Sequence, residues 1–280
     1  MPTPITAQDM HELRRAVALL ERPSLSIQIA NLIGSPVDWA VSKLPGFVTR
    51  RIQSAVRAAL YRACDAALFT LKDAPRAQAS TRLHKLAAAG SGAVGGFFGW
   101  AGLVAELPVS TTIMMRAVAD IARSEGFSLQ EPAVQAACIE VFALGGRSED
   151  DDAAESGYYA MRGMVAEVGR HTAAELARQV GDKSVEAFTR KLSARDAGHV
   201  MARLIESVAA RFGVVITEKT AAQMVPVLGA AAGATLNTLF TSHYQDMARG
   251  HFIVMRLERS YGHALVQSAY RDVYRGTPRR

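Results

Sequence analysis

The sequence predicts an all-α protein, a single multi-helical domain built round two glycine-rich helices, with no substantial sheet. Apolar residues recur at three- and four-residue steps along most of the 280 residues, which places them on one face of an α-helix. Hydrophobic residues make up 49% of the chain, enough for a sizeable core. The one β-like run in the sequence, GVVIT at 213–217, is too short to build a sheet.

The N-terminal region predicts three helices. The first begins after Thr6, which forms a capping pair with Asp9, and ends before Pro23. Two short helices follow over 25–33 and 36–43, separated and ended by Gly-Ser-Pro and Pro-Gly. The first helix has one apolar face, made of Met10, Leu13, Val17 and Leu20.

A longer helix is predicted over 48–69, with an apolar face opposite a basic one. The apolar face consists of Ile52, Val56, Ala59, Leu60, Ala63 and Ala67. The basic face consists of Arg50, Arg51, Arg57 and Arg62. These arginines either bind the anionic headgroups of a bilayer, where each contributes ~1 kcal/mol, or form an ordinary solvated surface.

Further helices are expected along the rest of the chain. The acidic segment RSEDDDAAESG at 147–157 is the clearest loop, and we interpret it as a solvated connection because no proline-rich linker accompanies it. The alternative is that this segment divides the protein into halves. The expected helices span 76–89, 109–124, 132–144, 158–179, 183–191, 197–212, 226–261 and 263–275.

Six glycines lie between Gly90 and Gly102, within an uncharged segment at 86–105. GSGAVG at 90–95 matches a dinucleotide-binding pattern, but a helical sequence precedes it instead of the strand that such a site requires. A membrane span needs about twenty apolar residues, and glycines or polar residues dilute both this segment and 220–245. We favour two helices packed through small residues at four-residue spacing. These residues are Gly92, Gly95, Gly96, Gly99, Gly229 and Gly233.

Glu106 is the strongest candidate for a functional polar residue. It ends the uncharged segment and precedes Pro108, where we expect a helix to start. A carboxylate buried there is either a general base or ligand-facing acid, or a structural cap or ion pair with a partner on the next helix. That helix offers Arg116, Asp120 and Arg123.

A second segment without charged residues, 220–245, supplies polar residues that can face Glu106. Asn237 and Thr241 are one helical turn apart, with Tyr244 beside them, so contact between the two glycine-rich helices would form a pocket. His243 is a weak catalytic candidate, because a histidine in an apolar segment is more often a hydrogen-bonded core residue. The full set of pocket candidates is Glu106, Pro108, Thr111, Thr112, Asp120, Asn237, Thr241 and Tyr244.

Other functional classes receive little support. Glu167, His171 and Glu175 share a helix face and can in principle bind a metal, but a solvated charged face explains them better. The sequence contains no zinc-protease, nucleophile-elbow or phosphate-loop motif, so we expect neither a metal nor another cofactor. Aromatic residues make up only 7% of the chain, which argues against nucleic acid as a partner. Cys64 and Cys138 are expected to be buried free thiols of a reducing compartment.

Several motifs together resemble the EcsC protein family. They are GGFFG at 95–99, AELPVSTT at 105–112 and PVLGAAAG at 226–233, followed by Asn237, His251-Phe252 and Arg256-Leu257. The resemblance covers about Leu44 to Tyr261. It implies a helical, intracellular bacterial protein associated with the membrane, and it carries over no catalytic residue. We therefore divide the chain into an N-terminal helical extension (1–45), an EcsC-like helical domain (46–262) and a basic C-terminal helix (263–280).

These observations predict a non-enzymatic accessory protein, cytoplasmic and peripheral on the inner face of the bacterial membrane. Its partner would be the anionic membrane surface or a membrane protein, which the arginine faces and uncharged glycine segments favour and the net charge of +6 permits. The family resemblance implies an association with an ABC transporter. One alternative is a hydrolase acting on a lipid-like substrate, with a pocket near Glu106 and His243. Another is a helical scaffold for a protein partner. The basic residues expected to face the membrane are Arg50, Arg51, Arg57, Arg62, Arg256 and Arg259.

Overall fold

A computed structural model confirms the predicted all-α class. It describes residues 4–34, 37–70, 99–144, 157–179, 194–223 and 229–276, and no strand occurs within these ranges. The expected helices over 76–89 and 183–191 lie outside the described residues. So do the acidic segment except Gly157, and Gly92, Gly95 and Gly96.

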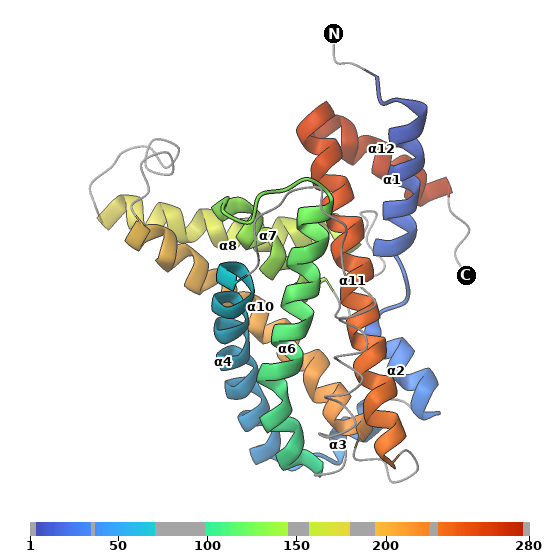
Figure 1. Cartoon of the computed structure of the whole chain (residues 1–280), viewed down its shortest axis with the longest axis vertical. Coiled ribbons are helices and arrows are strands. Elements are labelled where there is room, and N and C mark those ends of the chain that lie inside the picture. The colour runs from blue at the N-terminus through green and yellow to red at the C-terminus, as the bar shows by residue number, and fades with distance from the viewer. Residues whose placement is uncertain are drawn as a thin grey trace.

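Four long helices form the body of the protein (Figure 1). Helix α6 (Gly99–Ser124) packs between α4 (Gly46–Thr70) and α11 (Gly229–Tyr261). Helix α10 (Ala194–Gln223) crosses obliquely behind α6 in Figure 1 and contacts α4. The apolar faces of these helices enclose one continuous core.

The chain termini add helices to both ends of this bundle. Helix α1 (Ala7–Leu20) packs along α11, and α12 (His263–Gly276) packs against both of them. Helices α2 (Leu25–Ile33) and α3 (Val37–Ser42) lie at the opposite end, where α6 and α11 begin (Figure 1). Both α2 and α3 contact α10 there.

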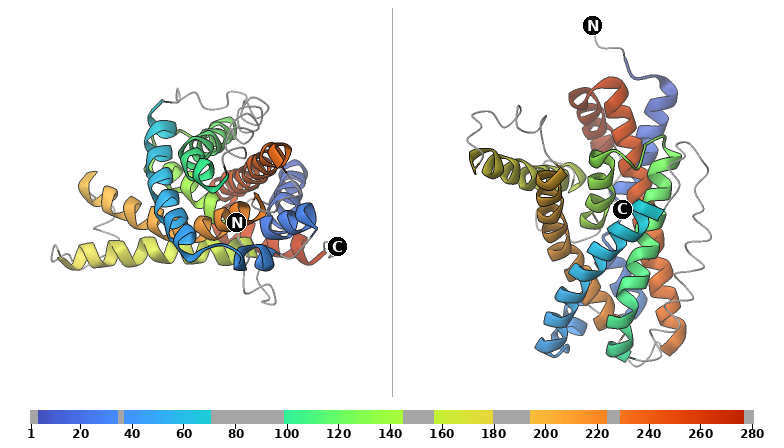
Figure 2. Two further views of the ribbon diagram at one scale, coloured as in Figure 1. Left: turned by 90° about the horizontal axis from the view of Figure 1, so that it is seen from below. Right: turned by 60° about the vertical axis from the view of Figure 1, so that its left-hand side comes forward.

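A second group of helices lies beside the bundle. Helix α7 (Pro132–Glu140) continues into the short 3₁₀ helix η1 (Val141–Ala143), and both contact α10. Helix α8 (Gly157–Gln179) also packs on α10. The last part of α8 and the first part of α10 project from the bundle to one side (Figures 1 and 2).

Local sequence signals correctly predict two of these helices. The backbone N–H of Asp9 donates to Thr6 Oγ1 at 3.2 Å, which is the predicted cap of α1. In α4, the predicted apolar face is buried wherever its side chains are described, from Ile52 to Ala63, and all four arginines of the opposite face are exposed.

The prediction that a helix starts at Pro108 is wrong. Helix α6 begins at Gly99 and continues through Pro108, although proline provides no N–H for the hydrogen bond to the preceding turn. Leu107 and Thr111, on either side of this position, are buried. Tertiary packing therefore outweighs the loss of one backbone hydrogen bond, as is common in protein helices.

The predicted end of a helix at residue 212 is also wrong. Helix α10 continues to Gln223 and includes the β-like run at 213–217. Val215 and Ile216 in this run are buried in the core, and their packing overrides the weak helix propensity of β-branched residues.

Gly250 allows close contact between α1 and α11. A Cβ atom at this position would lie 2.5 Å from Cγ of Leu20, which is shorter than side chains tolerate. We expect Gly250→Ala to lower the free energy of unfolding by about 1–3 kcal/mol, measured by urea denaturation. Gly163→Ala in α8 is the control, because its Cβ would meet no atom within 4 Å. Equal stability of the two variants would contradict this packing.

Candidate functional site

A buried polar cluster joins α6, α10 and α11. The Nδ2 atom of Asn237 donates to Oε1 of Glu106, and Nζ of Lys219 donates to Oδ1 of the same asparagine. Lys219 Nζ also lies 3.8 Å from Glu106 Oε1, so the lysine and the carboxylate form an ion pair. All three side chains are buried. The structure thus places Asn237 against Glu106, but the cationic partner comes from α10 and not from the later part of α6.

Lys219 is the functional candidate that sequence reasoning missed. It continues the apolar stripe of α10, whose earlier members are Leu204, Val208, Phe212 and Val215. Its Nζ atom lies 5.2 Å from the ring centroid of Phe240, which adds a cation–π contact. Burial lowers the pKa of Lys219, and the neighbouring Glu106 charge offsets part of this effect. The sequence signal that could have identified it is a lysine at a position where the three- and four-residue spacing of α10 otherwise places buried apolar residues.

The geometry of this cluster favours a structural ion pair over a general base. Glu106 Oε2 is buried and has no hydrogen-bond partner among the residues that the structure describes, and the other oxygen accepts from Asn237. A general base must reach a proton on a bound substrate, whereas this carboxylate lies between three packed helices. The cluster therefore fixes the relative positions of α6, α10 and α11.

The other predicted pocket residues do not all gather round Glu106: Asp120 lies about 21 Å further along α6, and Pro108 and Thr112 are only partly buried. Asp120 pairs with Arg123 one turn later, and Thr112 Oγ1 donates to the backbone carbonyl of Pro108 at 2.7 Å. Tyr244 is buried and stacks on Phe142, with 5.0 Å between ring centroids. Two further predicted residues, Thr111 and Thr241, are also buried.

His243 is a core residue. Its Nδ1 atom lies 3.4 Å from Nε2 of Gln28 on α2, and its ring packs edge-on against Tyr244. The hydrolase alternative requires His243 and Glu106 to share a pocket that a substrate can enter. Both side chains are buried, which does not favour that alternative.

His243 gives a pH-dependent prediction. Burial lowers the pKa of His243 to about 4, and the positive charge of Arg22 acts in the same direction. The folded state therefore favours the neutral ring, so its stabilising contribution is complete above pH 6.5 and is lost as the pH falls towards 4. The difference between the ordinary histidine pKa of 6.5 and the pKa of about 4 in the folded protein corresponds to roughly 3 kcal/mol of folding free energy.

We therefore expect His243→Gln to unfold with a smaller dependence on pH between 7 and 4 than the wild type, measured by urea denaturation at a series of pH values. His171→Gln is the control, because it makes the same substitution at an exposed histidine on α8. A wild-type pH profile in His243→Gln would contradict the assignment of a buried neutral ring.

The predicted membrane-facing arginines fall into two groups. Arg256 lies within 4.0 Å of carboxylates of Asp9, Glu12 and Glu125, and Arg259 pairs with Glu131 at 2.6 Å. On α4, Arg57 pairs with Glu206 at 3.0 Å. The second group is Arg50, Arg51 and Arg62, which are exposed and form no ion pair within the described parts of the chain.

Two exposed aromatic side chains lie where α3 meets α4. Trp39 on α3 is 52% exposed and Phe47 at the start of α4 is 49% exposed. Lys43 Nζ lies 5.9 Å from the Trp39 ring centroid. Phe47 precedes Arg50 and Arg51 by three and four residues, so these three side chains share one face of α4. We call the set Trp39, Lys43, Phe47, Arg50 and Arg51 the docking corner.

The remaining predictions concern metals, thiols and membrane spans. Glu167 contacts His171 at 2.9 Å, and no group of three potential ligands suited to a metal occurs among the residues that the structure describes. Cys64 and Cys138 are buried free thiols, and burial raises the pKa of Cys64 to about 12. Within the described helices, none is long and apolar enough to cross a membrane.

Comparison with known proteins identifies the family. The model of the EcsC protein family matches residues 8–257, which begins well before the region at Leu44 where the motifs start and therefore takes in α1, α2 and α3. No curated protein and no solved structure matches the chain. The division into three regions at residues 45 and 262 stays a prediction. The match spans most of the 280 residues, and the chain therefore belongs to the EcsC protein family.

Proposed function

We propose that this protein is a peripheral accessory protein that binds anionic membrane surfaces through the docking corner. The supporting observation is the combination of two half-exposed aromatic rings with three cations, Lys43, Arg50 and Arg51, that form no ion pair within the described residues. Tryptophan and phenylalanine partition into the headgroup region of a bilayer, and basic residues are attracted to its anionic surface. A merely solvated helix face would explain the arginines but not the exposed rings.

The position of the docking corner also supports this proposal. Helices α3 and α4 meet at the end of the bundle where α6 begins at Gly99 (Figure 1). In the sequence, the uncharged residues 86–98 directly precede this helix. The exposed aromatic and basic side chains thus lie at the end of the bundle where α6 begins, and residues 86–98 of the uncharged segment precede that helix in the sequence.

Vesicle flotation of the full-length protein tests the proposal. We expect flotation with vesicles of anionic phospholipid at low salt, and little flotation with neutral vesicles or at high salt, since salt screens exposed charges. Arg50→Gln/Arg51→Gln should weaken binding by about 2 kcal/mol, or roughly thirtyfold. Trp39→Ala/Phe47→Ala should also weaken binding, and the effect should persist at intermediate salt.

The matched control is Arg14→Gln/Arg15→Gln, two exposed arginines on α1 at the other end of the bundle. This variant should float like the wild type. Equal loss in both arginine variants would mean a nonspecific charge effect, and no flotation under any condition would overturn the proposal. Binding to native membranes but not to lipid vesicles, abolished by protease treatment of the membranes, would identify a membrane protein as the partner instead.

A further inference from the structure

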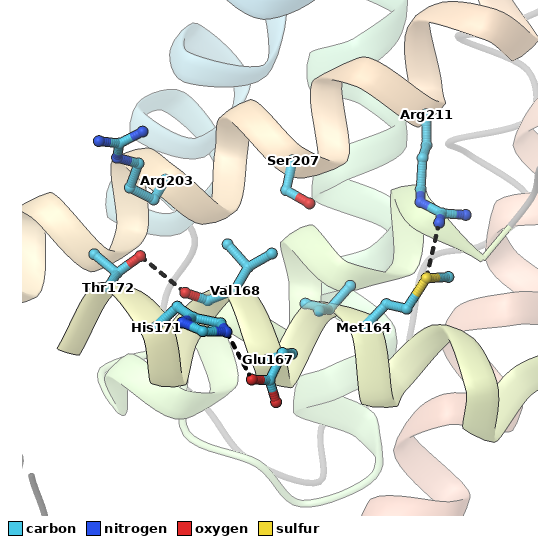
Figure 3. Close-up of a pocket in the computed structure, with 9 residues that line it drawn as sticks. Met164, Glu167, Val168, His171, Thr172, Arg203, Ser207 and Arg211 are labelled. Carbon is cyan, nitrogen blue, oxygen red and sulfur yellow. Dashed lines mark hydrogen bonds and ion pairs between the residues drawn. The ribbon is translucent and has the colours of Figure 1, made fainter. Parts of the chain in front are cut away.

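A groove between α8 and α10 lies apart from the docking corner (Figure 3). It has a volume of about 520 Å³. Its lining includes Met164, Val165 and Val168 from α8, and Arg203, Ser207 and Arg211 from α10. Small-molecule sites have volumes of roughly 300–1,000 Å³, so the groove has the size of a ligand site.

The α8 side of the groove has an apolar part, beside the polar side chains of Glu167, His171 and Thr172. Val165 is buried, and Met164 is 44% exposed at the groove. Val168 points up from α8 towards α10 in Figure 3. Methionine adapts its shape to irregular apolar ligands, so these three side chains form a surface suited to an alkyl chain.

The other side of the groove is basic. Arg203 and Arg211 form no ion pair with a carboxylate of the described residues. Arg211 reaches down to Met164, and its Nη2 donates to the methionine Sδ at 3.3 Å, although a thioether is a weak acceptor (Figure 3). The carboxylate that lines the groove, Glu167, is already paired with Arg170 and His171. Arg211 is therefore available to an anion.

Ser207 lies one helical turn before Arg211 on the same face of α10, about 6 Å along the helix axis. A carboxylate or phosphate held by the Arg211 guanidinium can thus also accept a hydrogen bond from the Ser207 hydroxyl. Arg203 lies one turn further, with its guanidinium directed away from α8 in the view of Figure 3. The anion-binding end of the groove is therefore at Arg211.

We propose that this groove binds a single-chain anionic amphiphile, with its head group at Arg211 and Ser207 and its alkyl chain along Met164, Val165 and Val168. The basic and apolar sides complement the two parts of such a molecule. A partner helix fits less well, because a helix with its side chains occupies on the order of 140 Å³ per residue. The groove would hold only about four residues of such a helix. This inference does not rest on the proposed function, because a dissolved monomer needs no bilayer.

Isothermal titration calorimetry of the full-length protein tests this site, with probes kept below their micelle concentrations. The probes are dodecyl phosphate, dodecanoate, dodecanol and inorganic phosphate. We expect both anionic amphiphiles to bind at least tenfold more tightly than dodecanol or inorganic phosphate. The stronger of the two anionic probes indicates whether the natural head group is a phosphate or a carboxylate.

Two variants separate the contributions of the head group and the chain. Arg211→Gln should weaken binding of the anionic probes at least tenfold and leave dodecanol unchanged. Val168→Trp should fill the apolar side and weaken all three alkyl probes, while circular dichroism and urea unfolding verify that each variant folds. Arg14→Gln/Arg15→Gln, remote from the groove, should bind like the wild type.

The proposal would be overturned if neither dodecyl phosphate nor dodecanoate binds, or if Arg211→Gln binds them with unchanged affinity. Arg50→Gln/Arg51→Gln should bind the soluble amphiphiles normally, and Arg211→Gln should still float with anionic vesicles. The two proposals can therefore fail independently.

Discussion

Lys219→Met is expected to lower the free energy of unfolding by about 3–5 kcal/mol. Methionine retains most of the length and the apolar stem of the lysine, but it leaves the buried Glu106 carboxylate without its cation and removes the donor to Asn237. Removing one partner of a buried ion pair is costly because the remaining charge stays desolvated. Urea denaturation followed by circular dichroism measures the change.

Two further variants test the cause of this loss. Lys43→Met changes an exposed lysine and should alter stability by no more than about 0.5 kcal/mol. The double variant Glu106→Gln/Lys219→Met removes both charges and should recover at least half of the loss, since a neutral amide costs less to bury. Lys219→Met with the stability of Lys43→Met would contradict the buried pair between α6 and α10.

Arg162→Ala in α8 is expected to destabilise the protein by about 3–5 kcal/mol. Arg162 Nη1 donates to both carboxylate oxygens of Glu258 in α11, at 2.9 and 3.0 Å. Tyr159 donates to the same carboxylate at 3.0 Å, and the guanidinium carbon lies 5.5 Å from the ring centroid of Tyr158. Alanine would leave this largely buried carboxylate with only Tyr159 and the exposed His263 as partners, and it would remove the ring contacts.

The same helix supplies the matched control for this prediction. Arg170 pairs with Glu167 on the exposed face of α8, so Arg170→Ala should cost no more than about 1 kcal/mol. Arg162→Lys should restore only part of the stability, because an ammonium does not reproduce the planar guanidinium contacts with the Tyr158 and Tyr159 rings. Equal unfolding midpoints for Arg162→Ala and Arg170→Ala would show that the Glu258 pair contributes little.

The parts of the fold that the sequence predicts well depend on local signals. The cap at Thr6 needs only the residue three positions later, and the buried face of α4 follows from helical periodicity alone. The left-handed glycine at position 262, with φ of 87°, separates α11 from α12 where glycine predicts a helix end. Such features do not require knowledge of neighbouring elements.

The features that sequence reasoning missed depend on tertiary packing. Pro108 lies inside α6 because the residues on either side of it, Leu107 and Thr111, are buried. Helix α10 continues through GVVIT because Val215 and Ile216 reach the core, while Val214 is exposed. Ending α10 at residue 212 hid Lys219, which lies two turns further along the same face. The prediction that the ion-pair partner of Glu106 lies on the later part of α6 is therefore wrong, because that partner is Lys219 of α10. The predicted contact between Glu106 and Asn237 is present.

The environment of the surface arginines and aromatic residues also depends on tertiary packing, which the sequence does not reveal. Helical periodicity predicts the exposed arginines of α4, but it does not reveal which of the basic residues find carboxylates in other helices. Arg256 looks free in the sequence, yet its carboxylate neighbours come from α1 and from the turn after α6. Exposure of Trp39 and Phe47 depends likewise on what covers α3 and the start of α4, which only the folded arrangement shows.

Fluorescence of Trp39 reports directly on membrane docking through the corner of α3 and α4. Trp39 and Trp100 are the two tryptophans of the chain, so Trp100→Phe leaves Trp39 as the single reporter. We expect a blue shift of its emission on addition of anionic vesicles, quenching by lipids brominated near the headgroup, and reversal by salt. Unchanged emission at vesicle concentrations that saturate flotation would contradict docking through this corner.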